Sequence, residues 1–163
     1  MLETLRRWKF GGDPCLRRGM GDLAVEALHR FWPREHFDAV VPVPCHAATL
    51  RRRGFDLPAF LSRGVAGAAG VPWRPLALQK AQAIPELVGL DVRQRVAAVR
   101  SAYRPRQGLE GSVLLVDDVV TSTVTARACA RACQEAGAGQ VRVLSLVRTP
   151  LEGAGRGGFA GGW

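Results

Sequence analysis

The residues best suited to chemistry lie together in the second half of the chain. They are two adjacent carboxylates followed by four hydroxyl side chains: Asp117, Asp118, Thr121, Ser122, Thr123 and Thr125. Free backbone N–H groups at the start of a helix attract phosphate, and hydroxyls add further donors. Paired carboxylates beside such a site can hold sugar hydroxyls or Mg²⁺-bound water. The run therefore predicts a sugar-phosphate site. The alternative, a simple helix cap, requires only one such residue.

The elements around this run predict a strand, a loop, a helix and a second strand. Val113–Val116 is an apolar run typical of a strand buried on both faces, and the two acids are expected to end it. A helix is expected over about 125–136, closed by Gly137, and a strand over Val141–Val147. Ligands of open α/β sheets bind beyond the carboxyl ends of the strands. The acids and hydroxyls stand at that position.

The run 113–125 resembles the signature of the type I phosphoribosyltransferases, which has four apolar residues, two acids and a Thr-Thr-Gly-x-Thr-like loop. The resemblance implies that Asp117 and Asp118 are the catalytic acids, in contact with the ribose hydroxyls of phosphoribosyl pyrophosphate (PRPP). It implies that Mg²⁺ accompanies the pyrophosphate. The loop implied to hold the 5′-phosphate comprises Thr121, Ser122, Thr123, Val124 and Thr125.

The same resemblance implies an α/β fold, a type I phosphoribosyltransferase-like parallel sheet of four to five strands flanked by helices. An irregular hood would come from the N-terminal segment and residues 71–112. We expect one domain over residues 1–151 and a flexible, Gly-rich tail over 152–163.

A narrower resemblance, to the ComF family of bacterial competence proteins, covers nearly the whole chain. Its segments are Lys9–Asp13, Val41–His46, Arg51–Phe55, Gly89–Leu90 with Arg93 and Arg95, and Val99–Tyr103, where the family reads Gly-Ala-Phe. The resemblance implies that Pro44, Cys45 and His46 belong to the pyrophosphate loop. It also implies a role in natural transformation, the uptake and processing of DNA, with single-stranded DNA or competence proteins as partners.

The basic run Arg51-Arg52-Arg53, followed by Gly54, is expected to be an exposed loop. Three interpretations stay open for it: a cover over the pyrophosphate, a contact for a DNA backbone, or a solvated turn. The chain carries 23 Lys and Arg against 14 Asp and Glu, a net charge of +9. Such a surface suits a polyanionic or phosphorylated partner, although a GC-rich genome also enriches arginine.

The chain departs from the family patterns at several positions. It has no four-cysteine zinc segment, Asp56 stands where the ComF run has Asn, and Thr123 replaces the loop glycine. Threonine disfavours the positive φ that glycine allows. The loop has therefore either taken a shape that threonine tolerates, or it holds the phosphate less closely. We expect Thr123→Gly to tighten PRPP binding by up to about tenfold. Nucleotide-sugar binding is better supported than turnover.

Other elements and the cellular setting follow from simpler patterns. Amphipathic helices are expected from Met20 to Phe31 and from Leu57 to Ala69, with strands over Ala39–Val43 and within Val71–Leu78. The cysteines are too few and scattered for a disulfide scaffold, and Cys129 and Cys133 read as packed thiols of one helix. Free thiols, no export signal and no apolar run long enough to span a bilayer predict a cytoplasmic protein without a membrane span.

Two function classes remain open. In the first, the protein is an enzyme that transfers phosphoribose from PRPP to an unidentified acceptor and releases pyrophosphate. In the second, it is a binding module for natural transformation, which uses PRPP as a ligand and contacts single-stranded DNA or uptake proteins. The ComF resemblance and the charge favour the second class, and the retained acids keep the first.

Overall fold

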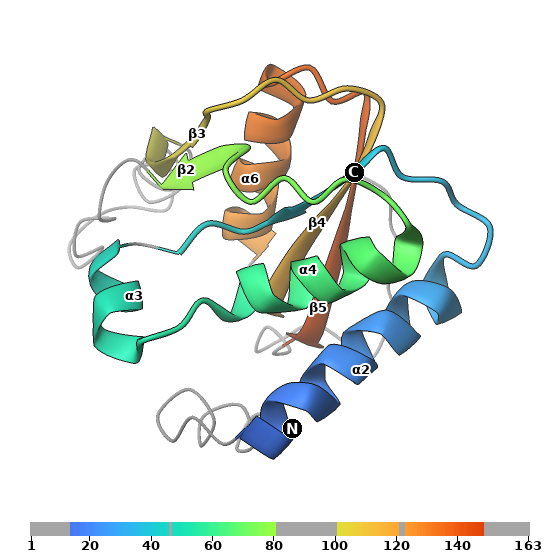
Figure 1. Cartoon of the computed structure of the whole chain (residues 1–163). Coiled ribbons are helices and arrows are strands. Elements are labelled where there is room, and N and C mark those ends of the chain that lie inside the picture. Colours follow the sequence, from blue (N-terminus) through green and yellow to red (C-terminus); the bar gives the residue numbers. More distant parts are fainter. Residues whose placement is uncertain (1–13, 46, 81–100, 121–122, 149–163) are drawn as a thin grey trace, which may run out of the picture.

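Three parallel strands form the central sheet, in the order β1-β4-β5 (Figure 1). Their bounds are Ala39–Pro42 for β1, Ser112–Val120 for β4 and Gln140–Arg148 for β5. Beyond β1, Trp73 adds a parallel bridge to Val40. The computed structural model describes residues 14–45, 47–80, 101–120 and 123–148. Within those ranges, β4 is the central strand, paired on both sides.

Helices cover both faces of this sheet (Figure 1). Helices α2 (Pro14–Phe31) and α4 (Leu57–Ala69) pack on one face. Helix α6 (Thr123–Glu135) packs on the other, together with an antiparallel ribbon of β2 (Leu78–Lys80) and β3 (Tyr103–Pro105). Both strands of the ribbon fall within residues 71–112, where the sequence predicts an irregular hood.

Side chains of β4 alternate between two separate hydrophobic clusters. Val113 and Leu115 belong to the cluster under α6 and the ribbon, whereas Leu114 and Val116 belong to the cluster under α2 and α4. All four are fully buried, at 0–1% exposure. Successive residues of a strand point to opposite faces, so an uninterrupted apolar run is what a strand between two cores requires.

Helix α4 has a well-defined start and end. Asp56 caps its N-terminus, where the carboxylate accepts a hydrogen bond from the Ala59 backbone N–H at 3.0 Å. Gly70 closes it in the left-handed conformation, with φ of 67°. Between these ends, Ser62 is fully buried and accepts a 2.9 Å hydrogen bond from the indole N–H of Trp73. The cap fixes Asp56 at the carboxyl edge of the sheet.

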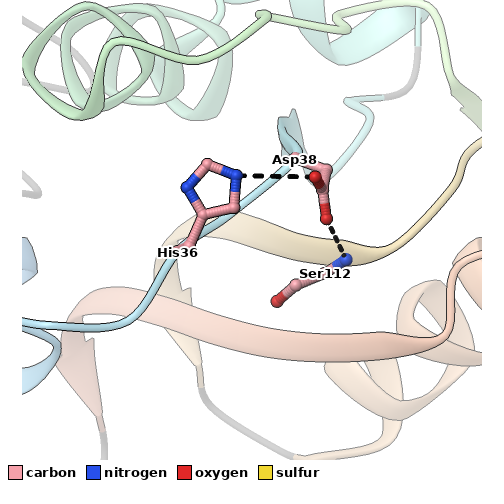
Figure 2. A network of polar contacts seen from close by, with 3 residues as sticks. All are labelled: His36, Asp38 and Ser112. Atoms are coloured by element: carbon pink, nitrogen blue, oxygen red, sulfur yellow. Dashed lines mark hydrogen bonds and ion pairs between the residues drawn. The ribbon is translucent and has the colours of Figure 1, made fainter.

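A polar network closes the opposite, amino edge of the sheet (Figure 2). The Asp38 carboxylate accepts a hydrogen bond from the Ser112 backbone N–H at 2.7 Å, and His36 Nε2 lies 3.5 Å from its other oxygen. The bond reaches the backbone of Ser112 and not its hydroxyl, so these three residues do not form a Ser-His-Asp catalytic arrangement. Their role is to join the entries of β1 and β4.

Most expected elements are confirmed, and three need correction. The two helices, the strand at 39, the helix closed by Gly137 and the final strand are present. The Val71–Leu78 strand is wrong: Pro72 and Pro75 lack the N–H that a ladder needs, and only the Trp73 bridge forms there, with β2 beginning at Leu78. The acids do not end β4, which continues to Val120.

The third correction concerns the basic run. Arg51–Arg53 is the last turn of a short helix, α3 (Ala47–Arg53), and not a loop. Alanine, leucine and arginine are strong helix formers, and cations are favourable at a helix C-terminus. Gly54, with φ of 76°, then ends the helix, and its N–H donates to the Leu50 carbonyl at 2.8 Å.

Among the described residues, no helix combines the length and apolarity that crossing a membrane requires. The expected tail at 152–163 and the short helix expected near Asp91 lie outside the described residues.

Candidate functional site

The two acids lie on β4 just past the point where β1 ends. The last β1–β4 pair is Pro42 with Val116, whereas β4 stays paired with β5 as far as Val120. Asp117 and Asp118 are therefore inside a strand that runs beyond its neighbour. Both are buried, with 7% exposure each. This overhang explains why the acids do not end the strand: their backbone still has a partner in β5.

Each carboxylate turns back onto the backbone of the next residue. Asp117 Oδ1 accepts from the N–H of Asp118, and Asp118 Oδ1 accepts from the N–H of Val119, both at 2.8 Å. A buried carboxylate needs such donors, because a charge out of water is costly unless it is hydrogen-bonded. The two bonds hold both side chains close to β4.

The acids face opposite sides of the sheet. Alternation along β4 places Asp117 on the α6 side and Asp118 on the α4 side. The groups that feel their charges agree with this placement. The charge of Asp117 raises the pKa of Tyr103 in the ribbon and of Cys129 on α6, and the charge of Asp118 raises the pKa of Asp56 at the start of α4. The pair thus places one carboxylate on each face of the sheet, near the carboxyl end of β4.

On the α4 side, Asp118 shares its surroundings with a second carboxylate. Burial raises the pKa of Asp56, and the negative charge of Asp118 raises it further, against the lowering effect of the hydrogen bond from Ala59. The sequence comparison with the ComF run marked residue 56 only as a departure from Asn. The structure adds that this departure brings a carboxylate to the site.

On the α6 side, Asp117 shares its surroundings with a phenol. Tyr103 is 3% exposed, and the Thr125 side chain in the first turn of α6 lies near enough to its hydroxyl to lower the pKa of Tyr103, against the larger effect of burial. Burial raises the pKa of Tyr103, with the nearby Cys129 and Asp117 adding to the effect. The phenol therefore keeps its proton and remains a hydrogen-bond donor.

The expected phosphate loop is partly helix. Thr123, Val124 and Thr125 form the first residues of α6, which begins two residues earlier than the sequence pattern indicates. Thr121 and Ser122 lie outside the described residues. No described residue other than glycine has a positive φ. Thr123 therefore has a backbone conformation that threonine tolerates. How closely the loop holds a phosphate stays a prediction.

The expected pyrophosphate loop follows β1. The Val43 N–H donates to the Val116 carbonyl at 2.8 Å, which leads the chain along β4 toward the acids. Pro44 and Cys45 come next, both half-buried, and Cys45 is close enough to contribute to the raised pKa of Tyr103. His46 lies outside the described residues. Cys45 thus lies near Tyr103, on the α6 side of the sheet.

The basic run is farther along, on α3. Arg51 is exposed. Arg52 and Arg53 complete the last turn of the same helix. In Figure 1, α3 projects from the body of the protein beyond the carboxyl end of β1.

Two of the cysteines are core residues, as expected. Cys129 and Cys133 are fully buried on α6, and burial raises the pKa of the Cys129 thiol well above its usual value and that of Cys133 to about 12. They stay protonated. Cys45 is only half-buried, and none of these three cysteines is in a disulfide.

The donor set at the acids suits Mg²⁺ delivered by a ligand. Mg²⁺ prefers oxygen donors, and it is commonly held by one or two carboxylates together with substrate phosphates. The described residues contain no group of three or more His, Cys, Asp or Glu that could hold a metal ion by themselves. Asp117 and Asp118 supply carboxylate oxygens of the kind that Mg²⁺ prefers.

The architecture matches solved structures of known enzymes. An allosteric regulatory enzyme of purine biosynthesis is similar over 85% of this chain and 29% of its own, with a TM-score of 0.55 and 19% identity. Glutamine PRPP amidotransferase from B. subtilis, solved with ADP and GMP, is similar over 84% of this chain and 29% of its own, with a TM-score of 0.52 and 20% identity. The chain thus spans less than a third of either.

A third match is nearer in size. Adenine phosphoribosyltransferase from Saccharomyces cerevisiae, solved with an imino-altritol bisphosphate and adenine, covers 85% of this chain and 71% of its own, with a TM-score of 0.52 and 16% identity. The fold is that of the type I phosphoribosyltransferases. At these identities the likeness shows the phosphoribosyltransferase fold alone. No protein-family model and no curated protein matches the sequence.

Sequence reasoning missed two members of the site, Asp56 and Tyr103. Asp56 has a readable signal, because an Asp directly before a helix that carries proline in its first turn is typical of an N-cap. Tyr103 has none, since only the packing of the ribbon on α6 brings it to Thr125.

Proposed function

We propose that the protein binds PRPP with Mg²⁺ at the carboxyl ends of β1 and β4. The observation that carries this proposal is the pair of buried carboxylates on the overhang of β4, directly before the first turn of α6, in a phosphoribosyltransferase-like fold. The two acids would hold the ribose hydroxyls. The first turn of α6, with the residues before it, would receive the 5′-phosphate on its N–H groups and hydroxyls.

The pyrophosphate would lie toward the segment after β1. Backbone groups of Pro44, Cys45 and His46 would contact it, and the arginines of α3 would cover it. Arginine suits this task because its guanidinium makes bidentate contacts with phosphate oxygens. Mg²⁺, when bound, would neutralise charge on the pyrophosphate.

We further propose that the protein serves natural transformation in the cytoplasm as a binding module, in contact with single-stranded DNA or competence proteins. The support is the resemblance to the ComF family and the net charge of +9. The exposed position of Arg51 on α3 is compatible with a phosphate-backbone contact.

The PRPP site is tested by isothermal titration of PRPP and Mg²⁺ into the native protein and into Asp117→Asn/Asp118→Asn. We expect binding by the native protein and none by the variant, with both folded. Asp22→Asn/Glu26→Gln removes two charges from exposed positions of α2 and is the matched control, expected to bind normally. Unchanged affinity in the folded acid variant would remove the ribose-site assignment.

The DNA contact is tested by the salt dependence of single-stranded DNA binding. Affinity should fall by roughly 0.7 log units per log unit of salt for each phosphate contact. Replacing Arg51, Arg52 and Arg53 with glutamine should lower this slope. Replacing Arg18, Arg30 and Arg34, exposed residues on or just after α2, changes the charge equally and should leave more of the slope intact. Binding that is absent at low salt would exclude the nucleic-acid role.

A second candidate is an active transferase that moves phosphoribose from PRPP to an acceptor and releases pyrophosphate. The retention of both acids in a phosphoribosyltransferase-like fold favours it. Pyrophosphate release measured with a panel of candidate bases separates the two functions. Robust release by the native protein would establish the enzyme, and PRPP binding without release would support the binding module.

A further inference from the structure

One hydroxyl of β5 lies level with the acids of β4. Ser145 is the partner of Asp117 in the parallel β4–β5 ladder. Val141 and Val143 of β5 pack on the α6 side, so strand alternation places Ser145 on the face that carries Asp117. The other residues from Val143 to Val147 are aliphatic. A half-buried serine within this run is therefore explained by the bonds it makes and not by apolar packing.

The Ser145 hydroxyl bonds to the backbone at the ends of both strands. It accepts a hydrogen bond from the Val120 N–H at 3.2 Å and donates to the Val147 carbonyl at 2.9 Å. It also lies 3.5 Å from the Asp118 carbonyl. The side chain thus ties the last residues of β4 to those of β5, with its β4 contacts on either side of Val119.

The same stretch of β4 orients the α4-side acid and leads into α6. Asp118 Oδ1 accepts from the Val119 N–H, which belongs to the same peptide group as the Asp118 carbonyl that Ser145 contacts. Only two residues separate Val120 from the first turn of α6, where the 5′-phosphate is proposed to bind. A shift at the end of β4 would therefore move both the Asp118 carboxylate and the start of that turn.

We infer that Ser145 is a positioning residue for the sugar-phosphate part of the PRPP site: its hydroxyl holds the Asp118 carboxylate and the entry to α6 in the geometry that binds ribose 5-phosphate. The inference rests on the proposed function. It predicts a division within the ligand. The pyrophosphate is assigned to the segment after β1 and to α3, whereas the Ser145 bonds lie at the ends of β4 and β5.

The test compares Ser145→Thr with Ser145→Val, two substitutions of nearly equal size and shape that differ in the hydroxyl. Both introduce a residue that strands favour. Calorimetric titrations with ribose 5-phosphate, PRPP and inorganic pyrophosphate, each with Mg²⁺, measure the parts of the ligand separately. We expect Ser145→Val to bind ribose 5-phosphate and PRPP about three- to tenfold more weakly than Ser145→Thr, the range of one net hydrogen bond. Inorganic pyrophosphate should bind both variants equally.

Ser62→Ala is the matched control for the loss of a hydrogen-bonded hydroxyl. Ser62 accepts from the Trp73 indole and donates to the Ala59 carbonyl at 3.0 Å, within α4. Its loss should lower the melting temperature and leave all three affinities unchanged when they are measured well below that temperature. Should Ser145→Val fail to fold, Ser145→Ala against Ser145→Thr tests the same hydroxyl.

The outcomes separate the inference from the function on which it rests. If the native protein binds PRPP and the two Ser145 variants bind ribose 5-phosphate equally well, the hydroxyl has a structural role only, and the inference fails while the PRPP site stands. The same holds if pyrophosphate affinity falls by the same factor. If the native protein binds no PRPP, the proposed function fails and this inference fails with it.

Discussion

Asp56 caps helix α4 on the side of the sheet that carries Asp118, near enough for the negative charge of Asp118 to raise the pKa of Asp56. The cap favours the carboxylate at residue 56, whereas burial and the second negative charge disfavour its ionised form. The net result is a raised pKa. Asp56 therefore stabilises the helix, and its ionised carboxylate repels the negative charge of Asp118.

We expect Asp56→Asn to change how stability depends on pH. The folded state holds the Asp56 proton more firmly than the unfolded chain, whose pKa is near 3.8. The resulting stabilisation is complete below that value and is lost as the pH rises through the raised pKa. Asparagine caps as well as aspartate and does not titrate. Thermal unfolding from about pH 3 to pH 7 should show the native protein losing stability relative to the variant.

Asp56→Ala is the control for the cap. It should lower the free energy of unfolding by about 1 kcal/mol, because the Ala59 N–H loses its acceptor. A stability difference between the native protein and Asp56→Asn that stays constant or grows in favour of the native protein with pH would contradict the raised pKa of Asp56.

Thr123→Gly should not tighten PRPP binding. The sequence alone favoured tightening, on the assumption that the position needs a positive φ, but Thr123 begins α6 in an ordinary conformation. Glycine removes a hydroxyl donor and lowers helix propensity. We expect affinity to fall by about two- to fivefold, with Thr123→Ser close to native, in the same titration. A tenfold gain for the glycine variant would restore the original expectation.

The thiols should differ sharply in reactivity. Only the thiolate reacts quickly, and burial keeps Cys129 and Cys133 protonated. In a Cys15→Ser background, a maleimide reagent should label Cys45 in the folded protein and the other two only after unfolding. PRPP with Mg²⁺ should slow labelling of Cys45 if the segment after β1 holds pyrophosphate, whereas Mg²⁺ alone should not. Equal rates at all three thiols would contradict the burial of the α6 pair.

Gly111→Ala should damage stability without affecting PRPP affinity. Gly111 has φ of 61°, and an added Cβ would collide with the Asp38 carboxylate. The backbone term alone costs about 1–2 kcal/mol. Because the site lies at the opposite edge of the sheet, affinity measured well below the melting temperature should match the native value. Gly108→Ala, with open space around it, is the matched control. A folded Gly111→Ala with native melting temperature would contradict the predicted clash.

The sequence was most informative where one local rule decides the structure. The apolar run of β4, the periodicity of α4 and the glycine after α6 each carry their own signal, and all three elements formed as expected. The acids stand out in the sequence because their residue types and position are distinctive, and their role in binding stays a prediction. The predictions for Arg51–Arg53 and for the end of β4 were wrong for the same reason, because charge was taken as a sign of irregular structure. Helix propensity determines the structure at Arg51–Arg53, and pairing with β5 extends β4 past the acids.

The separation of the two clusters by β4 has a genetic consequence. A substitution that loosens α4 reaches Asp118 and leaves the surroundings of Asp117 largely unchanged, and the reverse holds for α6 and the ribbon. In a deep mutational scan, epistasis between weakening and compensating substitutions should therefore fall into two blocks, one for each side of the sheet. The blocks should overlap only at the residues of β4 itself, where both cores meet.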